Sequence, residues 1–266
     1  ELEKQTRRLL KDPTEFAQDF TWQWLGLSAI DRLMPDARLI RSFTDAHREG
    51  MKREVMMSFR HVLDLNQSVT NLIAPDFVFT NEAVGRDIYQ LPSFPSARKK
   101  QKKKTSREMR KVPVDPSGHR GGLLGMPALM MATAVMRGVW LLENILGSPP
   151  PEPPKAVPAL TPDIGDATSP KAKLAAHMAE PSCAACHREI DPLGFALENF
   201  DPIGRWRVTY PVYTEQDGNS KRTDGLPIDA TGTLPTGEHL RDVTDLKKYL
   251  SENPTRFARC LSEKLL

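Results

Sequence analysis

Two cysteines and a histidine occur together at one place in the chain, as Cys183-Ala184-Ala185-Cys186-His187. Residues three apart lie on one face of a helical turn, so both sulfurs and the adjacent imidazole can reach a single bound group. This spacing is typical of a c-type haem attachment site, where each thiol bonds a vinyl group and the histidine binds the iron. The motif therefore predicts one covalently bound haem c, held by Cys183 and Cys186, with His187 as an axial ligand.

Three other interpretations of the motif are open. A thioredoxin-like dithiol would follow a β-strand, and no β-branched run precedes Cys183. A structural zinc site needs four ligands, and without a second paired-cysteine motif the fourth would have to be His177, His239 or Cys260. A chance pair of core cysteines is the plainest alternative. Because two of the chain's three cysteines fall at this spacing with histidine next, haem is the favoured interpretation.

The second axial position of the iron requires a residue from elsewhere. All ten methionines precede His187, which excludes the downstream methionine ligand of common small cytochromes c. His239 is the only downstream histidine, and its polar turn favours a surface role. His177, on the segment that leads into Cys183, is the favoured ligand, and an open iron position is the alternative. Other candidates are Met126, Met130 and Met131, followed by His119 and Met178.

Composition restricts the partners of the protein. The net charge is only +3 and no apolar run is long enough to span a membrane, so we predict no membrane span in this stretch. Basic residues concentrate at Arg98–Lys104 without interleaved aromatic residues, which argues against nucleic acid and favours an anionic polysaccharide, a surface or an acidic redox partner. Pro149–Pro158 holds six prolines and predicts an extended connection. The chain opens on Glu1 rather than methionine, so we expect a piece of something longer.

Apolar periodicity and turn residues predict the secondary structure. Helices are expected after Asp12-Pro13, from Asp36 to Leu63, over Val135–Leu146, from Ser169 toward Ala179, over Val243–Leu250 and after Asn253-Pro254. The helix of the cysteine motif is expected to end before Asp191-Pro192, because proline disfavours helix in the residue ahead of it. Short strands are expected at Arg205–Tyr210 and Ile228–Leu234, with a polar loop between them. Arg205 and Arg207 are expected either to fold back on the haem propionates or to form an exposed pair on a strand.

Several further segments resemble one known family, the planctomycetal multi-domain cytochrome-like proteins, whose modules are domains of unknown function. The resemblance rests on Trp24–Leu27 and Phe79–Glu82, on Arg120–Leu124 and Arg137–Gly147, and most specifically on the block from Cys183 to Arg207. The resemblance implies a haem-bearing, extracytoplasmic protein. It also implies a histidine at the position of His177. The family usually has a longer segment between the equivalents of Ala134 and Val135, which this sequence lacks.

We therefore expect a mainly α protein, with a helical domain followed by a cytochrome c-like haem module and a small α+β C-terminal cap. The expected boundaries are 1–90 for the helical domain, 91–160 for a basic and proline-rich connection, 161–215 for the haem module and 216–266 for the last module. The expected function is periplasmic or secreted electron transfer, as a module of a larger oxidoreductase with a redox partner protein. A peroxidase-like haem enzyme with an open iron site and a non-redox module that binds a surface or polysaccharide are the alternatives.

Overall fold

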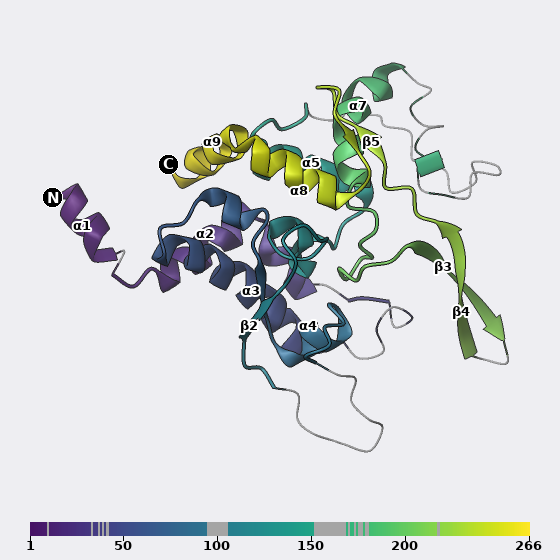
Figure 1. Ribbon diagram of the computed structural model, residues 1–266, viewed down its shortest axis with the longest axis horizontal. Helices are drawn as coiled ribbons and strands as arrows, with labels where there is room; N and C mark the ends of the chain where they lie inside the picture. Colours follow the sequence, from purple (N-terminus) through teal and green to yellow (C-terminus); the bar gives the residue numbers. More distant parts are fainter. Residues whose placement is uncertain are drawn as a thin grey trace.

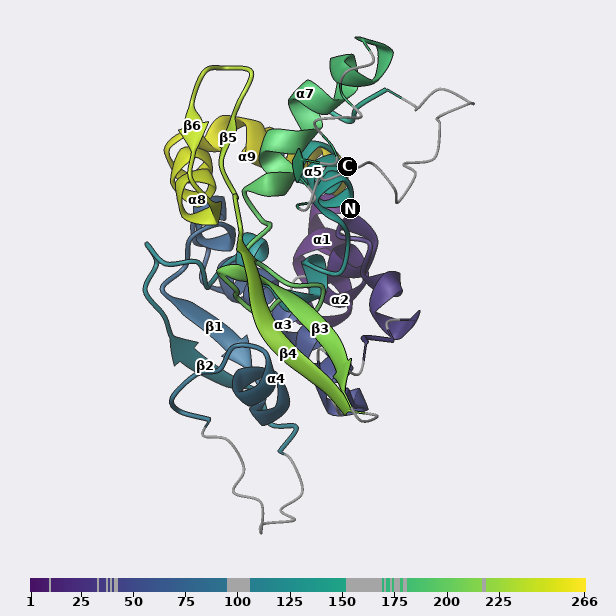
Figure 2. The same ribbon diagram turned by 90° about the vertical axis from the view of Figure 1, so that its right-hand side faces the viewer.

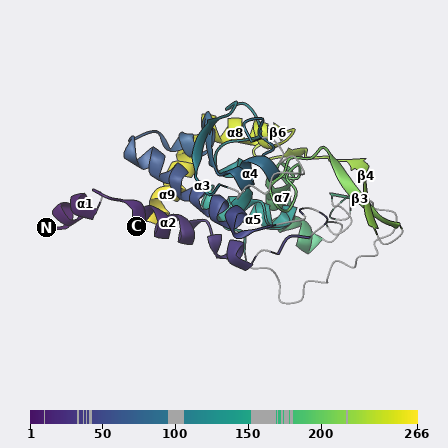
Figure 3. The same cartoon turned by 90° about the horizontal axis from the view of Figure 1, so that it is seen from below.

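The computed structural model describes residues 1–9, 11–32, 34–36, 38, 40, 43–94, 106–151, 169, 171, 172, 174, 178, 181–216 and 219–266. About half of the chain is helical and the sheets are small and antiparallel, so the protein is mainly α with an α+β part, as predicted. Most helices gather in one body, from which helix α1 projects at one end and the ribbon of strands β3 and β4 at the other (Figures 1 and 3).

Side-chain caps mark the start of several helices, such as Asn81 before α4, Thr133 before α5 and Asp242 before α8. The α-helices in the described ranges are α1 Leu2–Leu9, α2 Thr14–Trp24, α3 Asp45–Asp64, α4 Glu82–Asp87, α5 Ala134–Asn144, α7 Pro181–Phe195, α8 Val243–Glu252 and α9 Pro254–Leu265. Each sheet is a two-stranded antiparallel pair: β1 Phe77–Thr80 with β2 Arg110–Pro113, β3 Thr209–Gln216 with β4 Asn219–Pro227, and β5 Gly232–Thr233 with β6 His239–Leu240.

One hydrophobic core joins all four predicted segments of the chain. It contains Met51 of α3, Leu141 of α5, Leu197 just after α7 and Leu246 of α8, each with none of its side chain exposed. Burying such side chains stabilises a fold by roughly 1.5–3 kcal/mol each. The four predicted segments are therefore consecutive along the sequence, but all of them contribute side chains to one hydrophobic core.

Two tryptophans fasten α2 to α5. The indole Nε1 of Trp24 donates to the backbone carbonyl of Asn144 at 3.0 Å, and that of Trp140 donates to the carbonyl of Leu25 at 3.3 Å. Trp24 also stacks on Phe257 of α9, with ring centroids 6.3 Å apart. Since each buried indole N–H has a carbonyl partner, both tryptophans pack without an orphaned donor.

Helices α5 and α7 pack with their backbones in contact. A Cβ added to Gly138 would lie 2.2 Å from the carbonyl oxygen of Ile190, and one added to Gly194 would lie 2.0 Å from that of Ala134. Any larger residue at either glycine would hold the helices apart. The guanidinium of Arg137, on α5, then donates to the carbonyls of two residues that follow α7, Leu197 at 2.8 Å and Phe200 at 3.0 Å.

This packing corrects the predicted end of the motif helix. Helix α7 continues through Pro192 to Phe195, instead of ending before Asp191. The proline forfeits one backbone hydrogen bond and disfavours the residue before it, at a cost of about 3 kcal/mol. Contact with α5 holds the helix on both sides of the proline, at Ile190 and Gly194, and so outweighs the local preference.

The second predicted helix begins nine residues later than expected. Helix α3 starts at Asp45 rather than Asp36, because Thr44 adopts an extended backbone and forms a capping box with His47. The Thr44 N–H donates to His47 Nδ1 at 3.1 Å. Asp36 instead forms an ion pair with Arg38 two residues away.

The predicted ribbon exists, but its strands lie elsewhere. Thr209–Gln216 pairs with Asn219–Pro227, so much of the expected polar loop is strand β4. Trp206 instead bridges Phe200, and only Gly232–Thr233 of the second predicted strand lies in a sheet. Among the side chains that the structure describes, those of β4 are largely exposed and most of those of β3 are half-buried, so the pairing follows the ladder of backbone hydrogen bonds rather than an apolar pattern. Figure 2 shows this ribbon running away from α7.

Candidate functional site

The first turns of α7 carry the cysteine motif. Cys183, Cys186 and His187 are partly buried, and neither thiol is in a disulfide. Ile190 and Gly194 follow at helical spacing on the same face, and at these two residues α7 rests on α5. The thiols and the imidazole therefore continue the contact face of α7 toward its N-terminus, where the helix extends past α5 (Figure 1).

The imidazole of His187 is held by a carboxylate on the next helical turn. His187 Nδ1 lies 2.9 Å from Asp191 Oδ1, and only 5% of the Asp191 side chain is exposed. A proton on Nδ1 is donated to this carboxylate, so a metal would be bound through Nε2. Histidine ligands in metalloproteins commonly have such a carboxylate partner, which fixes the tautomer and the ring orientation.

A small crevice lies along the neighbouring side of α7. Glu189 and Leu193, three and seven residues after Cys186, line it together with Leu142 of α5 and Leu146, two residues after that helix. Its volume is about 210 Å³, and Leu234 also lines it. The surroundings of Cys186 are thus apolar on the side of the main core, against which the cysteine packs.

Lys171 anchors the segment that leads into the motif. Its ammonium donates to Asp229 Oδ2 and to the carbonyl of Thr231, both at 2.8 Å. Leu174 is 4% exposed and packs with Ala134 and Phe195 in a second small core. Lys171 is therefore tied to the β4–β5 connection, and Leu174 to the junction of α5 with α7. His177, the favoured second ligand, lies outside the described residues, and that role stays a prediction.

Arg205 and Arg207 have partners near the other end of α7. Arg205 Nε donates to Asp201 Oδ2 at 3.0 Å, and Arg207 donates to Glu198 Oε1 at 3.1 Å. Both carboxylates follow Phe195, the last residue of α7, whereas the cysteines lie in its first turns. At about 1.5 Å of rise per residue, some 15 Å of helix separates the motif from these pairs. Their predicted contact with haem propionates stays a prediction, and the structure gives them a second role in closing the loop after α7.

The other axial candidates lie in diverse environments. Met126 and Met130 are buried in the main core, Met131 packs against it, and Met178 is partly buried. His119 stacks on Trp206 with ring centroids 4.0 Å apart, and burial lowers its pKa to about 4. Among the residues the structure describes, no three His, Cys, Asp or Glu side chains gather to hold a metal ion, so the zinc alternative gains no support. Cys260 is buried beside Gly147, as a small core residue.

One buried cluster was missed by sequence reasoning. Glu54 of α3 is fully buried and accepts a hydrogen bond from the Tyr89 hydroxyl. The Arg120 guanidinium lies over the Tyr89 ring, 4.7 Å from its centroid, and donates to the carbonyls of Gly204 and Ile88. Burial raises the pKa of Glu54 to about 8, although Tyr89 and Arg120 act against this increase. The members lie far apart in the sequence, so no local pattern indicated that they meet.

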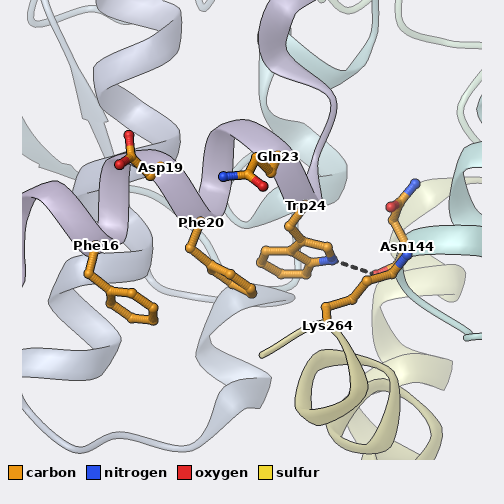
Figure 4. A pocket seen from close by; sticks show the side chains of 7 residues that line it. All are labelled: Phe16, Asp19, Phe20, Gln23, Trp24, Asn144 and Lys264. Carbon is orange, nitrogen blue, oxygen red and sulfur yellow. Dashed lines mark hydrogen bonds between the residues drawn. The ribbon is translucent and has the colours of Figure 1, made fainter. Parts of the chain in front are cut away.

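An aromatic-lined pocket lies on α2, away from α7. Phe16, Phe20 and Trp24 form a ladder along α2, next to Lys264 of α9, and line a pocket of about 470 Å³ (Figure 4). Phe20 and Trp24 stack on one another, with ring centroids 5.4 Å apart. Among the described residues that line this pocket, Asp19 is the one carboxylate, and neither a second acid nor a histidine accompanies it there.

Two features bear on the predicted partners. The basic run Arg98–Lys104 lies outside the described residues, so its predicted ligand stays untested. No helix in the described ranges is both long enough and apolar enough to cross a membrane.

Comparison with known proteins gives two matches to family models. Residues 1–91 match PSD4, a protein of unknown function (DUF1592), and residues 120–210 match PSCyt3, a protein of unknown function (DUF1588). The second match contains the cysteine motif, α5 and the Arg205–Arg207 segment. No curated protein and no solved structure matches the chain. The chain is thus similar in two separate regions to domains of unknown function typical of planctomycetal cytochrome-like proteins.

Proposed function

We propose that this chain is an extracytoplasmic c-type haem protein and acts as an electron-transfer module of a larger oxidoreductase. One observation carries the proposal: Cys183, Cys186 and His187 lie on consecutive turns of one rigidly packed helix, and the Nδ1 atom of His187 is oriented by a buried carboxylate. The donor set fits the group, because two thiols and an imidazole are what covalent haem attachment requires.

The attachment chemistry needs only groups that the chain and the haem bring. Each thiol adds across one vinyl C=C bond. A C–S bond forms at one vinyl carbon, and the hydrogen of the thiol moves to the other vinyl carbon. Nothing is oxidised or reduced in this addition, and the product is a thioether that acid does not break. Bound haem supplies the transfer of one electron between two oxidation states of iron.

The residues of the chain have three tasks in this proposal. Cys183 and Cys186 fix the cofactor to α7, His187 binds the iron through Nε2, and the packing of α5 keeps α7 in place. Compartment follows from the chemistry, because c-type haem attachment takes place outside the cytosol. A redox partner protein, and an anionic polysaccharide or surface at Arg98–Lys104, are the proposed partners.

Cysteine variants test the attachment. The protein would be produced in a bacterial host with a periplasmic haem-attachment system, and its intact mass measured. We expect the native protein to carry the mass of one haem, Cys183→Ala and Cys186→Ala to lose one thioether each, and the double variant to carry none. Cys260→Ala is the matched control, since this third cysteine packs beside Gly147, and it should keep the haem. A native protein without added mass would refute the proposal.

A variant of His177 tests the second axial position and separates carrier from enzyme. A six-coordinate, low-spin iron indicates an electron carrier, whereas a high-spin iron that binds cyanide rapidly indicates the peroxidase-like alternative. We expect a low-spin spectrum that His177→Ala converts to high-spin. An unchanged spectrum would exclude His177 and direct attention to Met126.

A further inference from the structure

We propose that Asp191 is a positioning residue of the haem site, which holds His187 in the Nδ1–H tautomer and, through it, lowers the reduction potential of the iron. This inference rests on the proposed function and deepens it, because it names a residue that tunes the reduction potential of the same site. The carboxylate lies one helical turn beyond His187, with 2.9 Å between Oδ1 and Nδ1.

The pair differs from the ion pairs on the protein surface. Only 16% of the His187 side chain and 5% of the Asp191 side chain are exposed, whereas the pair between Arg259 and Glu263, at the same spacing on α9, is 80% and 53% exposed. Exposed pairs of this kind stabilise a protein by at most about 1 kcal/mol, because water screens them. In a poorly solvated place the same geometry has a stronger electrostatic effect.

The backbone around Asp191 is clamped from two sides. The carbonyl of the preceding residue, Ile190, lies against Gly138 of α5, and a Cβ added to Gly232 of β5 would lie 2.8 Å from the Cα of Pro192. A carboxylate between two such contacts has little freedom to move away from the imidazole. Its position is therefore set by the fold rather than by the presence of a ligand.

A fixed anion on Nδ1 has a definite effect on an iron bound at Nε2. When the carboxylate accepts a hydrogen bond from Nδ1–H, the imidazole becomes a more strongly donating ligand, and the nearby negative charge stabilises the more positive ferric iron. Both effects lower the reduction potential.

Nuclear magnetic resonance of the native protein without haem tests the positioning step directly. Free histidine prefers the Nε2–H tautomer, so ¹⁵N-labelled native protein should show His187 as the Nδ1–H tautomer if Asp191 holds it. Asp191→Ala should return this signal to the Nε2–H form. An Nε2–H tautomer in the native protein would overturn the inference, whether or not any variant folds.

Potentiometric titration of the haem-loaded protein tests the electronic step. Asp191→Asn keeps an oxygen acceptor for Nδ1–H but removes the charge. It should raise the ratio of reduced to oxidised protein at a fixed ambient potential at least tenfold, which is about 59 mV for a one-electron couple. Glu143→Gln, an exposed carboxylate on α5, is the control and should leave the potential unchanged.

The outcomes separate the two proposals. An unaltered potential in Asp191→Asn, with the haem still attached, overturns the role of Asp191 and leaves the proposed function standing. A native protein that takes up no haem overturns both.

Discussion

Replacing Glu54 by glutamine is expected to remove a large pH dependence from the stability of the protein. The carboxyl group is fully buried and accepts a hydrogen bond from Tyr89, while its second oxygen has no hydrogen-bond partner within the described part of the chain. Burial in apolar surroundings disfavours the charged form, and it raises the pKa from 4.5 to about 8.

The magnitude follows from linkage between protonation and folding. Because the pKa in the folded protein lies above that of the unfolded chain, the folded protein binds more protons than the unfolded chain between pH 4.5 and pH 8. The free energy of unfolding therefore falls as the pH rises through this window. Each tenfold difference in proton affinity between the two states corresponds to about 1.4 kcal/mol, so the full loss is on the order of 5 kcal/mol. That is a large fraction of the roughly 5–15 kcal/mol that stabilises typical domains.

Urea unfolding at several pH values between 4.5 and 8.5 measures this effect. His119, whose lowered pKa gives the opposite slope between about pH 4 and 6.5, contributes equally to both proteins, so the difference between native protein and Glu54→Gln isolates Glu54. We expect the native protein to lose stability relative to the variant as the pH rises. Glu49→Gln, an exposed site on the same helix, should give a flat difference. A flat difference for Glu54→Gln would refute the reasoning.

Two further variants test the packing of α7 against α5 and the buried ammonium of Lys247 on α8. Gly138→Ala should destabilise the protein by about 1–2 kcal/mol in thermal unfolding, because the contact with the Ile190 carbonyl outweighs a helix-propensity gain of about 1 kcal/mol. The exposed Met136→Ala on the same helix should be near neutral, and equal melting temperatures for both would contradict the packing. Lys247→Met should cost about 2 kcal/mol in urea unfolding at pH 7, because the buried ammonium donates to two backbone carbonyls, and no loss would show those bonds to be dispensable.

Four helices were predicted from local signals because each combines a start signal with a regular apolar stripe. Helices α2, α5, α8 and α9 lie where expected. Phe257 and Leu261 of α9 are buried, whereas Leu265, one turn further on, is 46% exposed.

The local rules failed where long-range contacts decide the outcome. A proline such as Pro192 favours a helix end when only local sequence is considered. Here the backbone contact of α7 with α5 stabilises the helix on both sides of the proline, so α7 continues past it. No side chain of β3 or β4 outside residues 215–220 is fully buried, so no apolar alternation marked the register of these strands.

Part of the candidate site could be predicted from the sequence. The motif identified Cys183, Cys186 and His187, whereas Asp191 was interpreted only as part of a helix-terminating pair. Its spacing of four residues from His187 was the available signal, and it became visible only once α7 was known to continue through this position. For Arg205 and Arg207, the sequence showed the charges but not the carboxylates of Asp201 and Glu198 that would accept their hydrogen bonds.

The absorbance spectrum of the native protein after extraction with acidic acetone tests the central claim most directly. Thioether bonds to Cys183 and Cys186 resist acid, so the haem should stay with the precipitated protein and show the reduced spectrum of a c-type cytochrome when redissolved. Haem that passes into the acetone, or a protein without haem absorbance before extraction, would contradict the account.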